Sequence, residues 1–166
     1  MYLSVIIPVL NEAERIDACL RRLADQPGLG ECIVVDGGSA DDTAARAARH
    51  HRVQVVHSRR GRAVQLNTGA AAARGDTLLF LHADTELPDN AAVTVAATLA
   101  RPGVVAGGFR TWHRAERWRG KRRAALLHLA DIRSRYSSLL YGDQAMFMTA
   151  DIFRQVGGFP DLDLME

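Results

Sequence analysis

The chain has 166 residues and a net charge of +2; 48% of its residues are hydrophobic and 24% are charged. This balance predicts one globular domain over 1–166 and excludes a disordered or a collagen-like chain. Apolar runs such as 5–10 are far shorter than the roughly 20 residues of a membrane span, so neither a transmembrane helix nor a signal peptide is expected. The cysteines Cys19 and Cys32 are expected to be reduced thiols of a cytoplasmic protein.

Strand and helix patterns alternate along the first 110 residues. Strands are predicted where β-branched and apolar residues run together, at 2–9, 32–35, 53–57, 77–81 and 104–109. Helices are predicted where apolar or alanine residues recur at helical spacing, at 12–26, 41–50, 63–73 and 89–100. Asn11 can cap the first helix, and Asp41 or Asp42 the second. The alternation predicts an α/β fold with a mostly parallel central sheet and helices on both faces.

The pattern loosens after residue 110. A helix over 119–136, a strand over 145–148 and a short helix that ends at Gly157-Gly158 are predicted there. Between Arg110 and Arg123 the chain has seven basic residues and one acid, Glu116, and Trp112 and Trp118 lie among them. This segment is either a surface for an anionic partner, such as the membrane periphery, or a solvated helix face. No nucleic-acid-binding motif accompanies the charge, so nucleic acid is not an expected partner.

Polar residues follow each of the first four predicted strands, at 11–12, 36–39, 59–62 and 82–85. Parallel strands joined by right-handed crossovers end at one edge of the sheet, which is where such sheets bind ligands. The glycine motifs of dinucleotide-binding folds and of phosphate-binding loops are both missing. A phosphate would therefore need a cation held by Asp84 and the guanidinium fork of Arg62. Taken singly, Asp84 fits a turn or helix-cap residue better than a metal ligand, Asp36 is also a good turn former, and His82 fits a core or rim histidine.

Four motifs occur in order: Ser4-Val-Ile-Ile-Pro-Val-Leu-Asn-Glu12, Val34-Val-Asp-Gly-Gly-Ser-Ala-Asp-Asp-Thr43, Gly61-Arg-Ala-Val-Gln-Leu-Asn-Thr-Gly69 and Leu79-Phe-Leu-His-Ala-Asp-Thr85. The match resumes at Tyr141-Gly-Asp-Gln144 and Gly157-Gly-Phe-Pro160. Together they resemble the family 2 glycosyltransferases of GT-A fold, and more narrowly a bacterial subgroup of radical-SAM/selenodomain-associated transferases. The resemblance implies a three-layer sandwich. Residues 1–110 would form its nucleotide-sugar-binding part and 111–166 a partial acceptor part.

The resemblance also implies a role for each matching residue. Pro8, Asn11 and Glu12 would line the nucleoside pocket, and Asp36 would bind the base. Arg62 and Asn67 would lie near the ribose and phosphates, with Gln65 a weaker candidate. His82 and Asp84 occupy the family's Asp-x-Asp position, so Asp84 would contact Mn²⁺ or Mg²⁺. His82 replaces the first carboxylate, which weakens a site for hard cations, and we expect it to touch ribose rather than metal.

The family's catalytic base belongs to a Glu-Asp pair after the Gly-Gly-Phe segment. Glu166 matches the first member of this pair, and the following Asp is absent, so we expect the chain to be truncated. Asp143 and Gln144 are candidates for acceptor contact. Asp161 and Asp163 are the other nearby carboxylates, and they fit turn residues better than a base.

The expected function is a metal-dependent, inverting transfer of a sugar from a nucleotide sugar, by default a UDP-sugar, to a hydroxyl acceptor. The acceptor itself, whether a small molecule, a glycan or a lipid-linked group, is not predicted. Two alternatives stay open: a domain that binds nucleotide sugar without turnover, and a nucleotidyltransferase on a related sheet. The second would need a glycine-rich basic loop after the first strand, which residues 8–12 do not supply.

Overall fold

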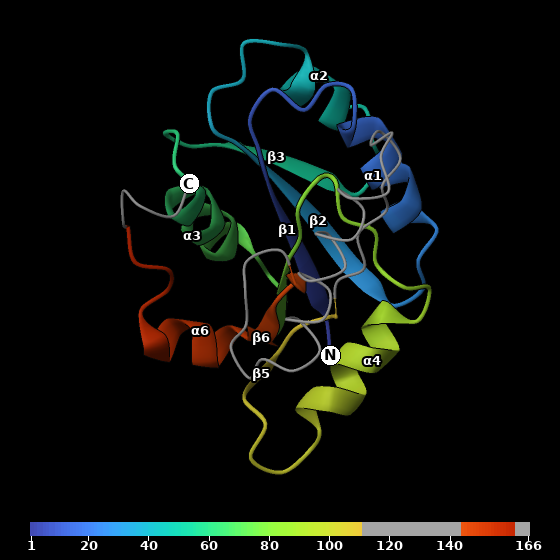
Figure 1. The fold of residues 1–166 in the computed structure, drawn as a ribbon, viewed down its shortest axis with the longest axis vertical. Helices are drawn as coiled ribbons and strands as arrows, with labels where there is room; N and C mark the ends of the chain where they lie inside the picture. The colour runs from blue at the N-terminus through green and yellow to red at the C-terminus, as the bar shows by residue number, and fades with distance from the viewer. Residues whose placement is uncertain (111–143, 162–166) are drawn as a thin grey trace, which may run out of the picture.

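The computed structural model describes residues 1–110 and 144–161, and these build one six-stranded sheet between two layers of helices (Figure 1). The strands are β1 (Leu3–Val9), β2 (Leu29–Asp36), β3 (Val53–His57), β4 (Thr77–Phe80), β5 (Ala106–Gly107) and β6 (Phe147–Thr149). Their order is β3-β2-β1-β4-β6-β5. The first four strands are parallel, and β6 runs antiparallel to both β4 and β5.

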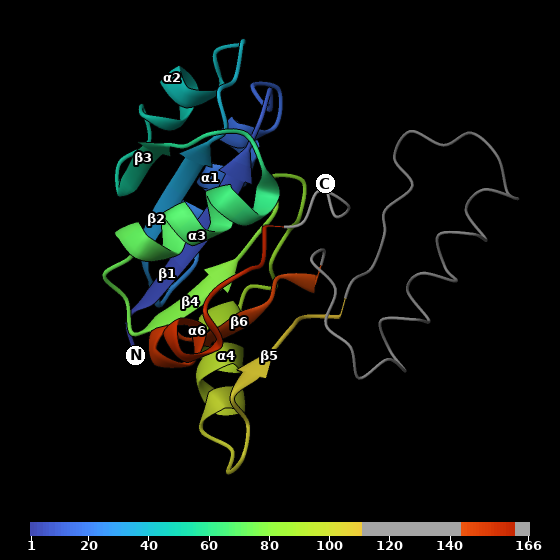
Figure 2. The ribbon, with the colours of Figure 1, turned by 90° about the vertical axis from the view of Figure 1, so that its left-hand side faces the viewer.

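Helices cover both faces of the sheet, as predicted. They are α1 (Ile16–Ala24), α2 (Thr43–Ala47), α3 (Arg62–Ala72), α4 (Ala91–Leu99) and α6 (Ala150–Val156). Successive side chains of a strand point to opposite faces. Val5 and Ile7 of β1 therefore pack with α1, α2 and α4, whereas Ile6 packs with α3 and α6. Figure 2 shows α3 and α6 together in front of the sheet. The mostly parallel three-layer α/β architecture is confirmed.

Several predicted boundaries shift. The first helix starts at Ile16 rather than at residue 12, because Asn11 has a φ of 55° and turns the chain away from helical geometry. Asn11 does not cap this helix, since its Oδ1 accepts the backbone N–H of Ala40 at 2.8 Å. The second helix is short, and Asp41 rather than Asp42 accepts the N–H of Thr43 at 3.0 Å. The strand predicted over 104–109 is reduced to the two residues of β5. The helix predicted over 119–136 lies outside the described residues.

The strands β1 and β4 separate at Pro8. The N–H of Leu81 donates to the carbonyl of Ile6 at 2.9 Å, so the backbone groups of Ile6 point toward β4. Every second residue of a strand directs its backbone groups toward the same neighbouring strand, and Pro8 therefore also points toward β4. The paired register of β1 and β4 ends at Ile6 and Phe80. The missing N–H of Pro8 therefore breaks no ladder bond. The strand order runs from β1 to β2 and β3 on one side and from β1 to β4 on the other. The gap between the carboxyl ends of β1 and β4 is therefore the topological switch point of the sheet, where such folds bind ligands.

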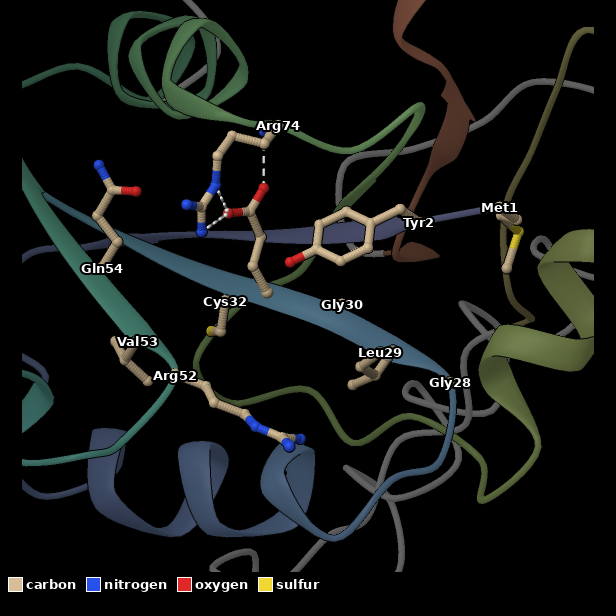
Figure 3. Close-up of a pocket in the computed structure, with 11 residues that line it drawn as sticks. Met1, Tyr2, Gly28, Leu29, Gly30, Cys32, Arg52, Val53, Gln54 and Arg74 are labelled. Carbon is tan, nitrogen blue, oxygen red and sulfur yellow. Dashed lines mark hydrogen bonds and ion pairs between the residues drawn. The ribbon is translucent and has the colours of Figure 1, made fainter.

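A buried carboxylate holds the opposite edge of the sheet together. Glu31 is 6% exposed and lies beside a hollow of about 550 Å³ (Figure 3). Its Oε1 accepts from the Ser4 hydroxyl at 2.6 Å and from the Arg74 backbone N–H at 2.7 Å, and its Oε2 lies 2.9 Å from Arg74 Nη2. Burial would raise the pKa of Glu31, but the hydrogen bonds from Ser4 and Arg74 together with the Arg74 charge outweigh it and lower the pKa.

Glu31→Gln is expected to lower the free energy of unfolding by about 1.5 kcal/mol at pH 7, because a charge-assisted network becomes partly unsatisfied. Because the pKa of Glu31 is lower in the folded state, its ionised form stabilises the fold at pH values above the ordinary pKa of 4.5. This stabilisation is lost as the pH falls through the folded-state pKa. The difference between wild type and variant in urea unfolding should therefore shrink below pH 4.5. Glu86→Gln, in an exposed pair with Arg22 at 2.9 Å, should change stability by less than about 0.5 kcal/mol. Equal effects of the two substitutions would contradict the role of Glu31.

Candidate functional site

Hydrogen bonds join the loops that follow β1 and β2 at the carboxyl edge of the sheet. The Asn11 N–H donates to the Ser39 hydroxyl at 3.0 Å, and the Glu12 N–H donates to the Thr43 hydroxyl at 2.8 Å. Asp41 accepts the N–H of Ala13 at 3.2 Å. Asn11 and Glu12 thus lie against the loop that follows Asp36.

The carboxylate of Asp36 is buried at the end of β2 and is 3% exposed. It accepts the backbone N–H groups of Gly38 at 3.3 Å and Ser39 at 3.2 Å, and it also accepts the Ser39 hydroxyl. His57 Nδ1 lies 3.4 Å from its Oδ2. These contacts are those of a turn-forming aspartate. A carboxylate offers about four acceptor positions, and Gly38, Ser39 and His57 already approach them. The turn therefore fixes the orientation of Asp36, and a ligand could bond it only in place of one of these contacts, of which that of His57 is the longest at 3.4 Å.

Gln65 joins the ends of β1 and β2. It is 5% exposed, and its amide nitrogen donates to the carbonyls of Val9 at 2.8 Å and Val35 at 2.9 Å. Both amide hydrogens are therefore bonded to the main chain. The structure places Gln65 as a support beneath the two loops, and helical periodicity alone gives no signal for this role.

Arg62, the first residue of α3, and His82, in the loop after β4, meet at the switch point. Arg62 Nη1 lies 2.9 Å from His82 Nε2, at the end of α3 nearest the loops. The two side chains border a small cavity of about 30 Å³ whose other lining residues are apolar or proline: Pro8, Leu66, Phe80, Leu81, Met146 and Phe159. Pro8 and Leu81 belong to the diverging strands, so the cavity lies where β1 and β4 separate.

Asp84 lies exposed beyond β4, and Thr85 Oγ1 donates to it at 3.3 Å. Arg15, which the sequence analysis did not select, contributes a cation to the same region. Its Nη1 lies 2.8 Å from Glu12 Oε2. The hydrogen bond and charge of Glu12 raise the pKa of Arg15, and the charge of Asp84 adds to this effect. The spacing of three residues between Glu12 and Arg15 is the signal that could have identified the pair.

Asp84 is the metal candidate among the described residues. No group of three or more His, Cys, Asp or Glu side chains that could hold a metal ion occurs within 1–110 and 144–161. Mg²⁺ and Mn²⁺ are commonly bound by one or two carboxylates when phosphate oxygens and water complete the coordination. The exposed carboxylate of Asp84 fits such a shared site, in which a diphosphate supplies the other ligands.

Other candidates lie elsewhere or outside the described residues. Asn67 is bonded to the main chain of Phe159 at 2.9 Å. The side chain of Asp161 pairs with Arg59, and Gln144 is buried, at 4% exposure. Asp143, Asp163 and Glu166 lie outside the described residues, as does all of the basic segment after Arg110.

The two cysteines lie in the hydrophobic core. Cys19 and Cys32 are free and buried, as expected for reduced thiols. Burial raises the pKa of Cys19 to about 12, which removes it as a nucleophile near neutral pH. In the described part of the chain, no helix is long and apolar enough to cross a membrane.

The sequence model of glycosyl transferase family 2 matches residues 4–157. An uncharacterized glycosyltransferase of Mycobacterium tuberculosis is 37% identical over 81 residues, which are 49% of this chain and 36% of that protein. A PGL/p-HBAD biosynthesis glycosyltransferase of Mycobacterium bovis is 37% identical over 111 residues, which are 63% of this chain and 41% of that protein. The chain thus spans well under half the length of these relatives.

Solved structures show the same fold. The glucosyl-3-phosphoglycerate synthase of Mycobacterium tuberculosis, solved with Mn²⁺, UDP and glucosyl-3-phosphoglycerate, is 25% identical with a TM-score of 0.64. The match covers 92% of this chain and 58% of that one. The mannosyltransferase PcManGT of Pyrobaculum calidifontis, solved with GDP-Man and Mn²⁺, has a TM-score of 0.73 at 24% identity. That match covers 96% of this chain and 47% of the other.

Proposed function

Because the chain belongs to glycosyl transferase family 2, we propose that it transfers a sugar from a nucleotide sugar to a hydroxyl group of an acceptor. The observation that carries this proposal is the meeting of Arg62 and His82, 2.9 Å apart, at the switch point of the sheet. A cation of fixed charge at this point can hold the diphosphate of a donor. Asp84, in the same loop as His82, supplies the carboxylate for a divalent ion.

The proposed roles follow the loops. Asp36 would accept from the base, and Pro8, Asn11 and Glu12 would line the nucleoside pocket. His82 would touch the ribose, and Arg62 would bind the phosphates. The chain is similar to a synthase solved with UDP and Mn²⁺, which supports a UDP-linked donor. The motifs at 60–62, 81–85 and 141–144 favour the radical-SAM/selenodomain-associated subgroup within the family.

Asp84 would hold Mn²⁺ or Mg²⁺ together with the donor's phosphate oxygens. When bound, the cation neutralises the negative charge that develops on the leaving diphosphate. Arg62 adds a second positive group to the same oxygens. Asn67 is not given a phosphate contact, since both polar atoms of its amide are bonded to Phe159.

Inversion at the anomeric carbon would require a carboxylate that removes the acceptor proton as the hydroxyl attacks from the opposite face. Glu166 and Asp143 are the proposed candidates for this side of the site. The acceptor, a small molecule, a glycan or a lipid-linked group, would approach from 111–166, and the basic residues after Arg110 would provide contact with the membrane periphery.

Isothermal titration with UDP and Mn²⁺ tests the proposal. One UDP is expected to bind per chain, and chelation of Mn²⁺ by EDTA should weaken binding at least about tenfold, since the ion bridges Asp84 and the phosphates. A parallel titration with GDP reports the base preference. Absence of binding by both nucleotides would contradict the proposal. Release of pyrophosphate from UTP and a sugar phosphate would favour a nucleotidyltransferase instead.

A further inference from the structure

Asn67 makes two hydrogen bonds to a single residue that lies 92 positions further along the chain. Its Nδ2 donates to the carbonyl of Phe159 at 2.9 Å, and its Oδ1 accepts the N–H of Phe159 at 2.9 Å. The side-chain amide therefore pairs with the main chain of Phe159 as a neighbouring strand would. Both polar atoms of the Asn67 side chain have a partner in this arrangement.

Two glycines let the chain reach Asn67 after α6. Gly157 ends α6 with a φ of 82°, and Gly158 follows with a φ of 77°. Both values lie in the left-handed region that glycine adopts without steric cost. A Cβ at Gly158 would lie 2.7 Å from Asn67 Oδ1. The two glycines therefore allow α6 to end and also leave room for the Asn67 side chain beside Gly158.

Phe159 brings the held segment to the candidate site. Its ring contacts Phe80 edge-on, with centroids 5.0 Å apart, and Phe153, with centroids 5.5 Å apart. The same residue lines the small cavity beside Arg62 and His82. Arg59, in the loop before α3, pairs with Asp161. Because both charges of this pair are largely exposed, we expect it to add little to the hydrogen bonds of Asn67.

One helix thus carries both the proposed phosphate ligand and the residue that holds the cavity wall. Arg62 begins α3, and Asn67 lies five residues later in the same helix. We propose that Asn67 is a positioning residue that fixes Phe159 and the segment 157–161 relative to Arg62. This inference rests on the proposed function. Loss of the contact would free the wall of the cavity that Phe159 forms beside Arg62.

Asn67→Ala tests this role, and Gly158→Ala tests it from the other side of the contact. Hydrogen exchange in 157–161 is expected to accelerate at least about tenfold in both variants, because two hydrogen bonds are lost or strained. Exchange in β1 and β2 should stay as in wild type. The affinity for UDP with Mn²⁺ should fall about fivefold, since the cavity wall beside Arg62 is displaced.

Thr68→Ala is the matched control, because Thr68 is also half-buried on α3 but bonds its own helix, at the Val64 carbonyl. It should change neither the exchange in 157–161 nor the UDP affinity by more than about twofold. Unchanged exchange in Asn67→Ala, or faster exchange with wild-type UDP affinity, would overturn the positioning role. Failure of the wild-type protein to bind either UDP or GDP would instead contradict the proposed function, whereas the hydrogen-exchange comparison tests the positioning contact by itself.

Discussion

Asp84→Asn is expected to weaken UDP binding in the presence of Mn²⁺ by about 30-fold or more, and to remove most of the effect of Mn²⁺. Asn keeps the size of Asp84 but removes the negative charge, and a hard cation depends on that charge. Within the described residues no group of three or more His, Cys, Asp or Glu side chains could hold the ion by itself. Titration of wild type and variant with UDP, each with Mn²⁺ and with EDTA, measures the loss.

Asp89→Asn provides the matched control. Asp89 is exposed and lies five residues after Asp84, before α4. The substitution removes the same negative charge from the same region. Comparison of the two variants therefore distinguishes direct metal binding by Asp84 from the general attraction of a cation to nearby negative charge. We expect less than a twofold change in UDP affinity. Equal losses in the two variants, or wild-type binding by Asp84→Asn, would contradict the role given to Asp84.

Gly69→Val is expected to lower the free energy of unfolding by about 3 kcal/mol, at the upper end of the range for overpacking a core. A Cβ at Gly69 would lie 2.4 Å from Cγ2 of Ile6 and 2.9 Å from Cγ2 of Val35. Both neighbours are fully buried in the central strands, so neither can move aside. The helix α3 would have to lift from the sheet. Urea unfolding of the two proteins measures the difference.

Ala71→Val is the comparison for this substitution. Ala71 is exposed on α3, so valine there lowers helix propensity, by about 0.6 kcal/mol, without overpacking the sheet. If Gly69→Val costs no more stability than Ala71→Val, then the close approach of α3 to β1 and β2 does not restrict the size of the side chain at position 69. Since Arg62 and Asn67 lie on this helix, Gly69→Val should also weaken UDP binding.

The alternation of apolar strands and helices predicts the architecture because each element carries its own local signal. The strand predicted over 53–57 matches β3 residue for residue, because polar residues on both sides of a β-branched stretch define where the strand begins and ends. The predicted start of the first helix is wrong because Asn11 bonds a different partner, Ala40, in the loop after β2. The strand over 104–109 was overestimated since its extent depends on pairing with β6, which lies 40 residues away.

The candidate site is predictable to the level of its loops. Parallel strands deliver polar residues to one edge by topology, so residues at the ends of β1, β2 and β4 gather there. The structural roles of Gln65 and Asn67 could not be predicted, because each side chain hydrogen-bonds main-chain atoms of a segment that is distant in the sequence. Periodicity marks both as positions on a helix and does not identify the carbonyls of Val9 and Val35 or the peptide of Phe159 as their partners.

The bonds between Asn11, Glu12 and the loop from Ser39 to Thr43 have an entropic consequence. Ordering a free loop costs roughly 1–2 kcal/mol for each residue whose backbone becomes fixed. Here the two loops already hold each other through backbone donors and side-chain oxygens. A nucleoside that enters between them would meet a preorganised wall, so little of its binding free energy would go into immobilising the protein.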